Sequence, residues 1–306
     1  MAVALFIGGN GLLSAGALRG WLEGGNEVAA YWTDYPPKPR PSLESLLAPG
    51  WTVGGLLRRH RIGQRAVRMR ELADAQAEIR RLGADTLISA VTMQIIRPEV
   101  LVLFGARAVN FHPALLPHYR GPSPFLGTIL DERDDCAGAS LHVLSAGIDE
   151  GPVVDQVAVP YGATGRRYAA WIARHARAFR QLARESLPRY LDGSIVASPQ
   201  ATGSYRRVNE EAIIGPRVSL EEARRRLRLA GDTRHILTNV PGRRRPVSLK
   251  RFEAELGPPT GGPPRLGLLE VELDLADARV RISRTTGIDR QADRVASLRE
   301  LLRPQL

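Results

Sequence analysis

The stretch Asn110-Phe-His-Pro-Ala-Leu-Leu-Pro-His-Tyr-Arg-Gly121 places polar side chains at the end of an apolar run. Residues 108–111 are predicted to form a buried strand that leads into it. Because side chains alternate along a strand, Asn110 and His112 are expected to lie on the same side, and Pro113 keeps His112 extended. Ligands of open α/β sheets bind beyond the carboxyl ends of the strands, so this strand end is a candidate site.

A second stretch, Gly147-Ile-Asp-Glu-Gly-Pro152, predicts a tight loop that carries Asp149. An amide can hold a carbonyl oxygen, a histidine exchanges a proton near neutral pH, and an aspartate orients a histidine or accepts a proton. Taken singly, Asn110 and Asp149 are also ordinary strand-end and turn residues. Asn110, His112 and Asp149 together favour transfer of a small carbonyl group over phosphate or redox chemistry.

The N-terminal region predicts an open α/β sheet. An apolar run at 3–7 ends in Gly8-Gly-Asn-Gly11, and a helix at 15–23 and a strand at 27–32 follow. The glycines do not form a dinucleotide fingerprint, so we interpret them as a tight turn. The other elements predicted in this region are strands at 86–91, 139–144 and 152–159 and helices at 72–82 and 166–190.

The amino-acid composition of the chain changes near residue 205, at a polar stretch at 198–207 that is typical of a linker. Beyond it we expect one charged helix at 219–229 and short strands at 268–273 and 278–283, as in a small barrel. The prediction is therefore an α/β protein with an open, mostly parallel, Rossmann-like sheet in a catalytic domain at 1–205. A smaller, β-rich, OB-like domain occupies 206–306.

Composition limits the class of protein. The chain has 306 residues, 43% hydrophobic residues, a net charge of +11 and one cysteine, Cys136, so it lacks a disulfide framework and a cysteine-based metal site. Lys38 and Lys250 are the only lysines among 43 basic residues, which fits anionic partners or simply an arginine-rich genome. Neither a signal peptide nor a membrane span is indicated, and a cytoplasmic location is expected. The sequence assigns no oligomeric state.

The two motifs, with their spacing, resemble the folate-dependent formyltransferases, which include methionyl-tRNA formyltransferase, glycinamide ribonucleotide formyltransferase and amino-sugar N-formyltransferases. The resemblance implies that Asn110, His112 and Asp149 are catalytic. It implies that N10-formyltetrahydrofolate donates its formyl group directly to an amine, without a metal. Asn110 and a protonated His112 would hold the oxyanion, and Asp149 would keep His112 cationic and help to remove the amine proton.

The resemblance also implies that backbone groups of two segments bind the folate. These groups belong to Met93, Gln94, Ile95 and Ile96, and to Leu144, Ser145, Ala146, Gly147 and Ile148. Arg120 and Gly121 would border the acceptor site. His142, inside a predicted strand, is interpreted as structural.

The sequence constrains the acceptor of the formyl group less than it constrains the transfer chemistry. The turn Arg243-Arg-Arg245 could contact phosphate or simply be solvated. The tRNA enzymes carry a basic loop, but 35–41 has only Lys38 and Arg40. Val240-Pro-Gly-Arg243 only partly matches their Trp-Pro-Gly-Ala-type signature. We therefore expect a small-molecule amine, such as a nucleotide-linked amino sugar or a natural-product intermediate. Methionyl-tRNA is the alternative, followed by a formyltetrahydrofolate hydrolase or a non-catalytic nucleic-acid-binding homologue.

Overall fold

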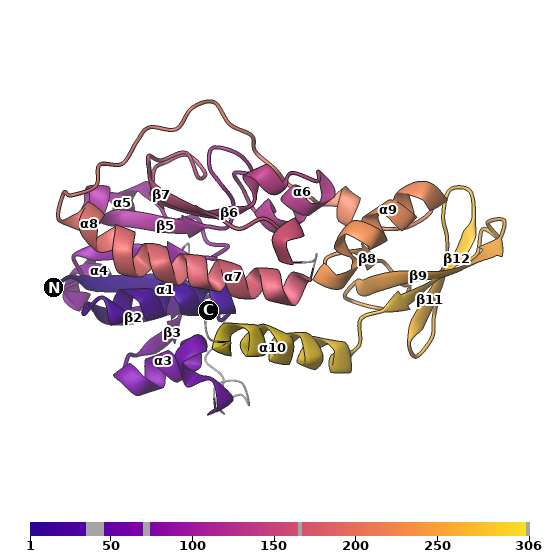
Figure 1. Ribbon diagram of the computed structural model, residues 1–306, viewed down its shortest axis with the longest axis horizontal. Helices are drawn as coiled ribbons and strands as arrows, with labels where there is room; N and C mark the ends of the chain where they lie inside the picture. Colours follow the sequence, from indigo (N-terminus) through magenta and orange to yellow (C-terminus); the bar gives the residue numbers. More distant parts are fainter. Residues whose placement is uncertain (35–45, 70–73, 165–166, 304–306) are drawn as a thin grey trace. The chain divides into compact units, whose positions relative to one another are not determined.

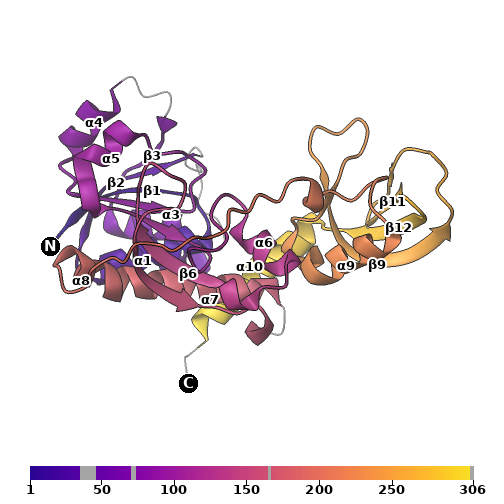
Figure 2. The ribbon, with the colours of Figure 1, turned by 90° about the horizontal axis from the view of Figure 1, so that it is seen from above.

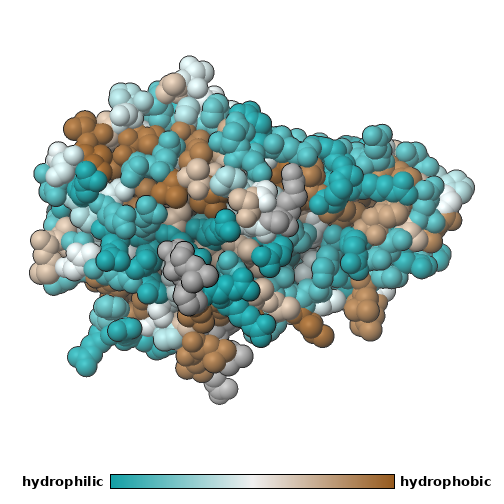
Figure 3. Space-filling model, in the orientation of Figure 1, coloured by the Kyte–Doolittle hydropathy of each residue, from teal (hydrophilic) through white to brown (hydrophobic). Residues whose placement is uncertain are grey.

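The computed structural model describes residues 1–34, 46–69, 74–164 and 167–303, in two compact units (Figure 1). Unit 1 comprises 1–124, 134–206 and 295–306, and unit 2 comprises 125–133 and 207–294. The loop at 35–41, with Lys38 and Arg40, lies outside the described residues. Hydrophilic side chains prevail on the face in Figure 3. In the described part of the chain, no helix has the length and apolar character of a membrane span.

Unit 1 contains a seven-stranded sheet in the order β3-β2-β1-β4-β5-β6-β7. Its strands are β1 Val3–Gly8, β2 Glu27–Thr33, β3 Gln64–Ala66, β4 Thr86–Ala90, β5 Ala108–His112, β6 Gly138–Val143 and β7 Val153–Ala158. The first five strands are parallel, whereas β6 is antiparallel to β5 and β7 to β6. The predicted Rossmann-like, mostly parallel sheet is confirmed.

Helices cover both faces of this sheet (Figures 1 and 2). They are α1 Leu12–Glu23, α3 Val53–His60, α4 Ala75–Leu82, α5 Pro98–Phe104, α7 Tyr168–Gln181 and α8 Leu187–Leu191, with a π-helical turn at Leu182–Ser186. Helices α1 and α7 lie side by side because α1 carries glycines at the contact. A Cβ on Gly16 would overlap the carbonyl of Ala176, and one on Gly20 the carbonyl of Arg180.

Packing on the two faces of the sheet decides which way the side chains of β5 point. An apolar cluster on one face joins Leu5, Leu87 and Ala108 to Ile79 of α4 and Val100 of α5. On the other face, the ring of Phe111 packs against Phe179 of α7, with the ring centroids 5.5 Å apart. Since side chains alternate, the neighbours of Phe111 at 110 and 112 point away from α7.

The helix α10 Gly287–Leu302 was not predicted, and its last turns belong to unit 1. Leu298 and Leu301 are buried in a cluster with Trp51. Arg177 of α7 donates hydrogen bonds to carbonyl oxygens at the end of α10, the shortest at 2.6 Å, as expected for a cation at a helix C-terminus. Only these last turns bury apolar side chains, so the amphipathic pattern in the sequence is weak.

Unit 2 contains a five-stranded antiparallel sheet in the order β10-β11-β12-β9-β8. Its elements are β8 Leu237–Thr238, β9 Val247–Gly257, β10 Arg265–Leu266, β11 Glu270–Asp274, β12 Arg279–Arg284 and the helix α9 Leu220–Ala230, and α6 Pro124–Leu130 lies at the division between the units. This half-barrel sheet agrees with the predicted OB-like, β-rich region. The longest strand, β9, was missed because charged residues fill its outward positions.

Candidate active site

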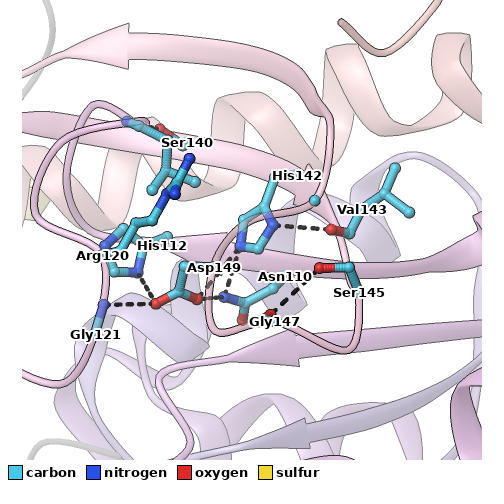
Figure 4. Close-up of polar contacts among 12 residues, drawn as sticks. Asn110, His112, Arg120, Gly121, Ser140, His142, Val143, Ser145, Gly147 and Asp149 are labelled. Atoms are coloured by element: carbon cyan, nitrogen blue, oxygen red, sulfur yellow. Dashed lines mark hydrogen bonds and ion pairs between the residues drawn. The ribbon is translucent and has the colours of Figure 1, made fainter. Parts of the chain in front are cut away.

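The site is built where β5 ends, and the Asp149 carboxylate lies at its centre (Figure 4). Oδ2 of Asp149 accepts a hydrogen bond from the Gly121 N–H at 2.9 Å and lies 3.5 Å from Nδ1 of His112. Oδ1 lies 3.4 Å from Nδ2 of Asn110 and 3.6 Å from Nε2 of His142. The two sequence motifs therefore meet, and the alternation on β5 brings Asn110 and His112 to the same carboxylate.

The contacts of Asn110 define how its amide is oriented. A carboxylate only accepts hydrogen bonds, so the atom that faces Asp149 must be the amide nitrogen. The same nitrogen lies 3.0 Å from Nε2 of His142, whose Nδ1 lies 2.9 Å from the carbonyl oxygen of Val143. A neutral His142 with its proton on Nδ1 satisfies both contacts.

These contacts bring His142, which the sequence pattern indicated as structural, to the site. Its side chain is only 1% exposed, and it contacts both Asn110 and Asp149. His142 pairs with Asn110 across β5 and β6. Only the pairing of the two strands brings it to the site, and no local motif marks it.

His112 is buried with oxygen atoms next to both of its ring nitrogens. Its Nε2 lies 2.9 Å from the carbonyl oxygen of Tyr119, and its Nδ1 faces Asp149. Burial lowers the pKa of His112, and repulsion from His142 in its protonated form adds to this, whereas Asp149 and the Tyr119 carbonyl act in the opposite direction. The net lowering favours the neutral imidazole, whereas the family resemblance implied a cation.

Asp149 stays ionised despite its burial. Burial alone would raise its pKa, but the neighbouring His142 and His112 rings and the Gly121 N–H lower the pKa to about 2. The backbone of Asp149 has a φ of 55°, in the left-handed region that Asp and Asn enter more readily than most residues. The predicted tight loop thus aims an anionic carboxylate into the site.

The loop that follows His112 is held by hydrogen bonds to side chains of β6 and β7. The Ser140 hydroxyl donates to the carbonyl of Ala114 at 2.6 Å and accepts from the Leu116 N–H at 3.0 Å. The Gln156 amide donates to the carbonyl of Leu116 at 2.8 Å. Gly121 has a φ of 98°, and a Cβ there would meet the ring of Tyr205. A glycine is therefore needed where the backbone approaches Asp149.

The segment at 198–207, predicted as a linker, is hydrogen-bonded along the site. The Gln200 amide donates to the carbonyl of Asp149 at 2.9 Å and to that of Gly151 at 2.6 Å. Its carbonyl oxygen accepts from Arg120 at 2.8 Å. Gln200 thereby connects the Asp149 loop to the Arg120–Gly121 turn. Nothing in the local sequence distinguishes it from an ordinary linker residue.

The two segments expected to bind folate approach the same apolar cluster, in which Ile96 is buried and on which Leu144 packs. Met93 and Ile95 are 74% and 76% exposed, and Ile148 is 50% exposed. The side chain of Gln94 is already engaged, because its carbonyl oxygen accepts from the Met69 N–H at 2.6 Å and its NH₂ donates to the carbonyl of Val67 at 2.8 Å.

The second segment is the loop after β6. Ser145 donates to the carbonyl of Gly147 at 3.3 Å, while Ala146 is exposed. Among the described residues, no group of His, Cys, Asp and Glu side chains has an arrangement that could hold a metal ion.

Comparison with known proteins supports the resemblance that the motifs indicate. Residues 53–168 match the family model described as formyl transferase. A methionyl-tRNA formyltransferase of Herpetosiphon aurantiacus is 33% identical over 178 residues, 58% of this chain and 56% of that enzyme. This alignment thus spans just over half of the relative. A methionyl-tRNA formyltransferase of Halorhodospira halophila is 27% identical over 93% of this chain and 91% of its own length.

Among solved structures, an N-formyltransferase from Helicobacter canadensis, in complex with folinic acid and dTDP-3-aminofucose, has the same fold. The TM-score is 0.55 at 15% sequence identity, over 92% of this chain and 99% of that one. The likeness in fold therefore extends over nearly the whole of both chains.

Proposed function

Because residues 53–168 match the formyl transferase family model, we propose that this protein is an enzyme that transfers the formyl group of N10-formyltetrahydrofolate to a primary amine. One observation carries the proposal: the Asp149 carboxylate contacts Asn110, His112 and the Gly121 N–H in one buried cluster. An amide donor, a neutral base and a fixed anion are the groups that amine acylation needs.

The proposed reaction moves one formyl group and one proton. The amine nitrogen attacks the formyl carbon, and the carbonyl oxygen becomes an oxyanion that replaces Oδ1 of Asp149, 3.4 Å away, as an acceptor for the Asn110 NH₂. His112, neutral at rest, takes up the proton released by the amine, and Asp149 and the Tyr119 carbonyl then stabilise the imidazolium. The bond from carbon to N10 breaks as His112 returns the proton to N10. The products are a formamide and tetrahydrofolate.

Formyltetrahydrofolate is the co-substrate in this proposal, and residues 93–96 and 144–148 bind it. Met93, Ile95 and Ile148 would cover the flat pterin, because exposed apolar side chains beside a polar cluster are typical of a ligand site. Since the side chain of Gln94 is already engaged, the backbone of this segment would supply the polar contacts. The complex of the Helicobacter canadensis enzyme with folinic acid supports this assignment.

The acceptor that we propose is a small-molecule amine, such as a nucleotide-linked amino sugar. The near full-length likeness to the Helicobacter canadensis fold supports it, as does the absence of a Trp-Pro-Gly-Ala-type signature at 240–243. We also propose that 1–205 acts as the catalytic domain and that 206–306 influences acceptor choice. Methionyl-tRNA is the second candidate, because the Halorhodospira halophila relative aligns over 93% of this chain.

Mass spectrometry tests the proposal directly. The full chain is incubated with N10-formyltetrahydrofolate and, in parallel, with dTDP- and UDP-linked amino sugars, with free amino sugars and with methionyl-tRNA. We expect a small amine to gain one formyl group and Asp149→Asn to abolish the gain. Formylation of methionyl-tRNA alone would promote the second candidate. Release of formate without any formylated amine would identify a hydrolase, and no turnover of the folate at all would contradict an enzymatic function.

A further inference from the structure

Unit 2 contains a cavity of about 450 Å³ that none of the residues assigned to formyl transfer lines. Its lining residues belong to the turn before β9 and the start of β9, to the end of β12 and to the first turn of α10. Figure 1 labels these three elements. Five arginines contribute to the lining: Arg243, Arg244, Arg245, Arg284 and Arg290. Its described lining contains no Asp or Glu. So dense a positive charge in a concave site raises the local concentration of anions.

The charge of these arginines is not neutralised by neighbouring acids. Arg243, Arg244, Arg245 and Arg290 are exposed and make no ion pair with a carboxylate of the described residues. The two nearest acids along α10 are bound to other cations: Asp289 pairs with Lys250 at 2.6 Å, and Asp293 pairs with Arg234 at 2.5 Å. Lys250 and Arg234 do not line the cavity, so Arg243, Arg244, Arg245 and Arg290 remain available for a ligand.

The backbone around the cavity is tied together by hydrogen bonds. The Thr285 N–H donates to the carbonyl of Ser248 at 2.9 Å, and the Arg284 N–H donates to that of Leu269 at 2.8 Å. Thr286 caps α10: its hydroxyl donates to Asp289 at 2.7 Å and accepts from the Asp289 N–H at 3.2 Å. The backbone at Arg284 and at the first turn of α10, which carries Arg290, is thus held in place before a ligand binds, which lowers the cost of binding.

The lining also indicates the chemistry of the ligand. A guanidinium group can donate two parallel hydrogen bonds to the oxygens of one phosphate. The hydroxyls of Ser248, Thr285 and Thr286 add further polar partners. Only Pro246 and Val247 are apolar, which disfavours a hydrophobic ligand. The volume lies within the range of small-molecule sites. We propose that this cavity binds a compact phosphorylated ligand that carries a pyrophosphate group, as a nucleoside diphosphate does.

Calorimetry with inorganic pyrophosphate tests the site on the full chain. We expect saturable binding that weakens as NaCl is raised and a dissociation constant at least about tenfold higher for R243A/R244A/R245A. The matched control R217A/R228A/R265A removes the same charge from exposed arginines of unit 2 that do not line the cavity, and it should bind like the parent. If both triple variants weakened binding equally, binding would depend on the overall charge of unit 2 and not on this cavity, and the proposal would be wrong.

A second variant distinguishes a loss of binding from misfolding of the triple variant. Arg290→Glu changes one exposed side chain on α10, so it should keep the thermal unfolding midpoint and still weaken pyrophosphate binding. A labelled single-stranded RNA forms the other arm. If R290E weakens RNA binding while the parent binds no pyrophosphate, the cavity is part of a nucleic-acid surface and the small-ligand proposal is wrong. The Asp149→Asn variant should bind pyrophosphate like the parent, because Asp149 does not line the cavity. The binding test therefore remains valid even if the proposed formyl transfer is wrong.

Discussion

Oδ2 of Asp149 lies 3.5 Å from Nδ1 of His112, while Nε2 of the same ring lies 2.9 Å from the Tyr119 carbonyl. One proton can satisfy only one of these two ring nitrogens. Burial keeps the imidazole neutral by lowering its pKa, whereas the two oxygens favour the cation. His112 is therefore placed to gain a proton during a reaction and to lose it again.

Asp149→Asn should lower kcat by at least about 10²-fold, because it removes the anion that stabilises a protonated His112. Asparagine also enters the left-handed region, so the loop should keep its shape. The control is Glu150→Gln, the same change at the adjacent, exposed acid. Steady-state kinetics checks both variants, and equal rates for the two would mean that Asp149 is misassigned.

His112→Ala should lower kcat by about 10²-fold or more, since it removes the group that carries the proton. Binding of a non-reactive folate, measured by calorimetry, should remain close to that of the parent. His118→Ala in the same loop, where the side chain is exposed, serves as the control. Near-normal turnover in His112→Ala would contradict the proposed proton transfer.

His142→Gln should shift the acid limb of the kcat profile to higher pH. His142 lowers the pKa of both His112 and Asp149, so its removal raises both values. The parent should need neutral His112, and its acid limb should therefore lie below pH about 6.5. Rates measured from pH 5 to 8 provide the test, and an unshifted limb would leave His142 with a packing role alone.

Met93→Ser combined with Ile95→Ser should weaken folate binding by about tenfold or more, because apolar burial contributes roughly 1.5–3 kcal/mol per large side chain. The single change Val102→Ser, at a similarly exposed position on α5, is the control and should leave binding unchanged. Calorimetry with 5-formyltetrahydrofolate measures the difference. Unaltered affinity in the double variant would remove the 93–96 segment from the folate site.

His175→Gln should flatten the pH dependence of stability. Burial lowers the pKa of His175 to about 4, although the carbonyls of Trp171 and Gly138 act in the opposite direction. The unfolded chain therefore binds the proton first, and the free energy of unfolding falls by about 1.4 kcal/mol per unit as pH drops from about 6.5 to 4. Urea unfolding across that window checks the slope, with exposed His60→Gln as the control that should keep it.

Local sequence predicted six of the seven strands of the first sheet and the two motifs that meet at the site, but it did not predict β3, α3 or α5. Pro113 and the glycines around Asp149 restrict the backbone, and the alternation on β5 places Asn110 and His112 together, so a linear motif could predict their meeting. The helix α10 was missed because the burial of Leu298 and Leu301 depends on partners far away in the chain. Strand β9 was missed because its charged alternation resembles a solvated loop.

The sequence by itself predicted six strands of the first sheet in their chain order, a formyl-transfer chemistry and the candidate residues Asn110, His112 and Asp149, because these depend on short-range backbone restraints and side-chain type. Only the tertiary structure brought in His142 and Gln200, which reach the site through strand pairing and through a distant segment. It also decided that burial lowers the pKa of His112, and it gathered arginines from separate elements around one cavity. Burial and charge density depend on what surrounds a residue in space, and no local pattern encodes that.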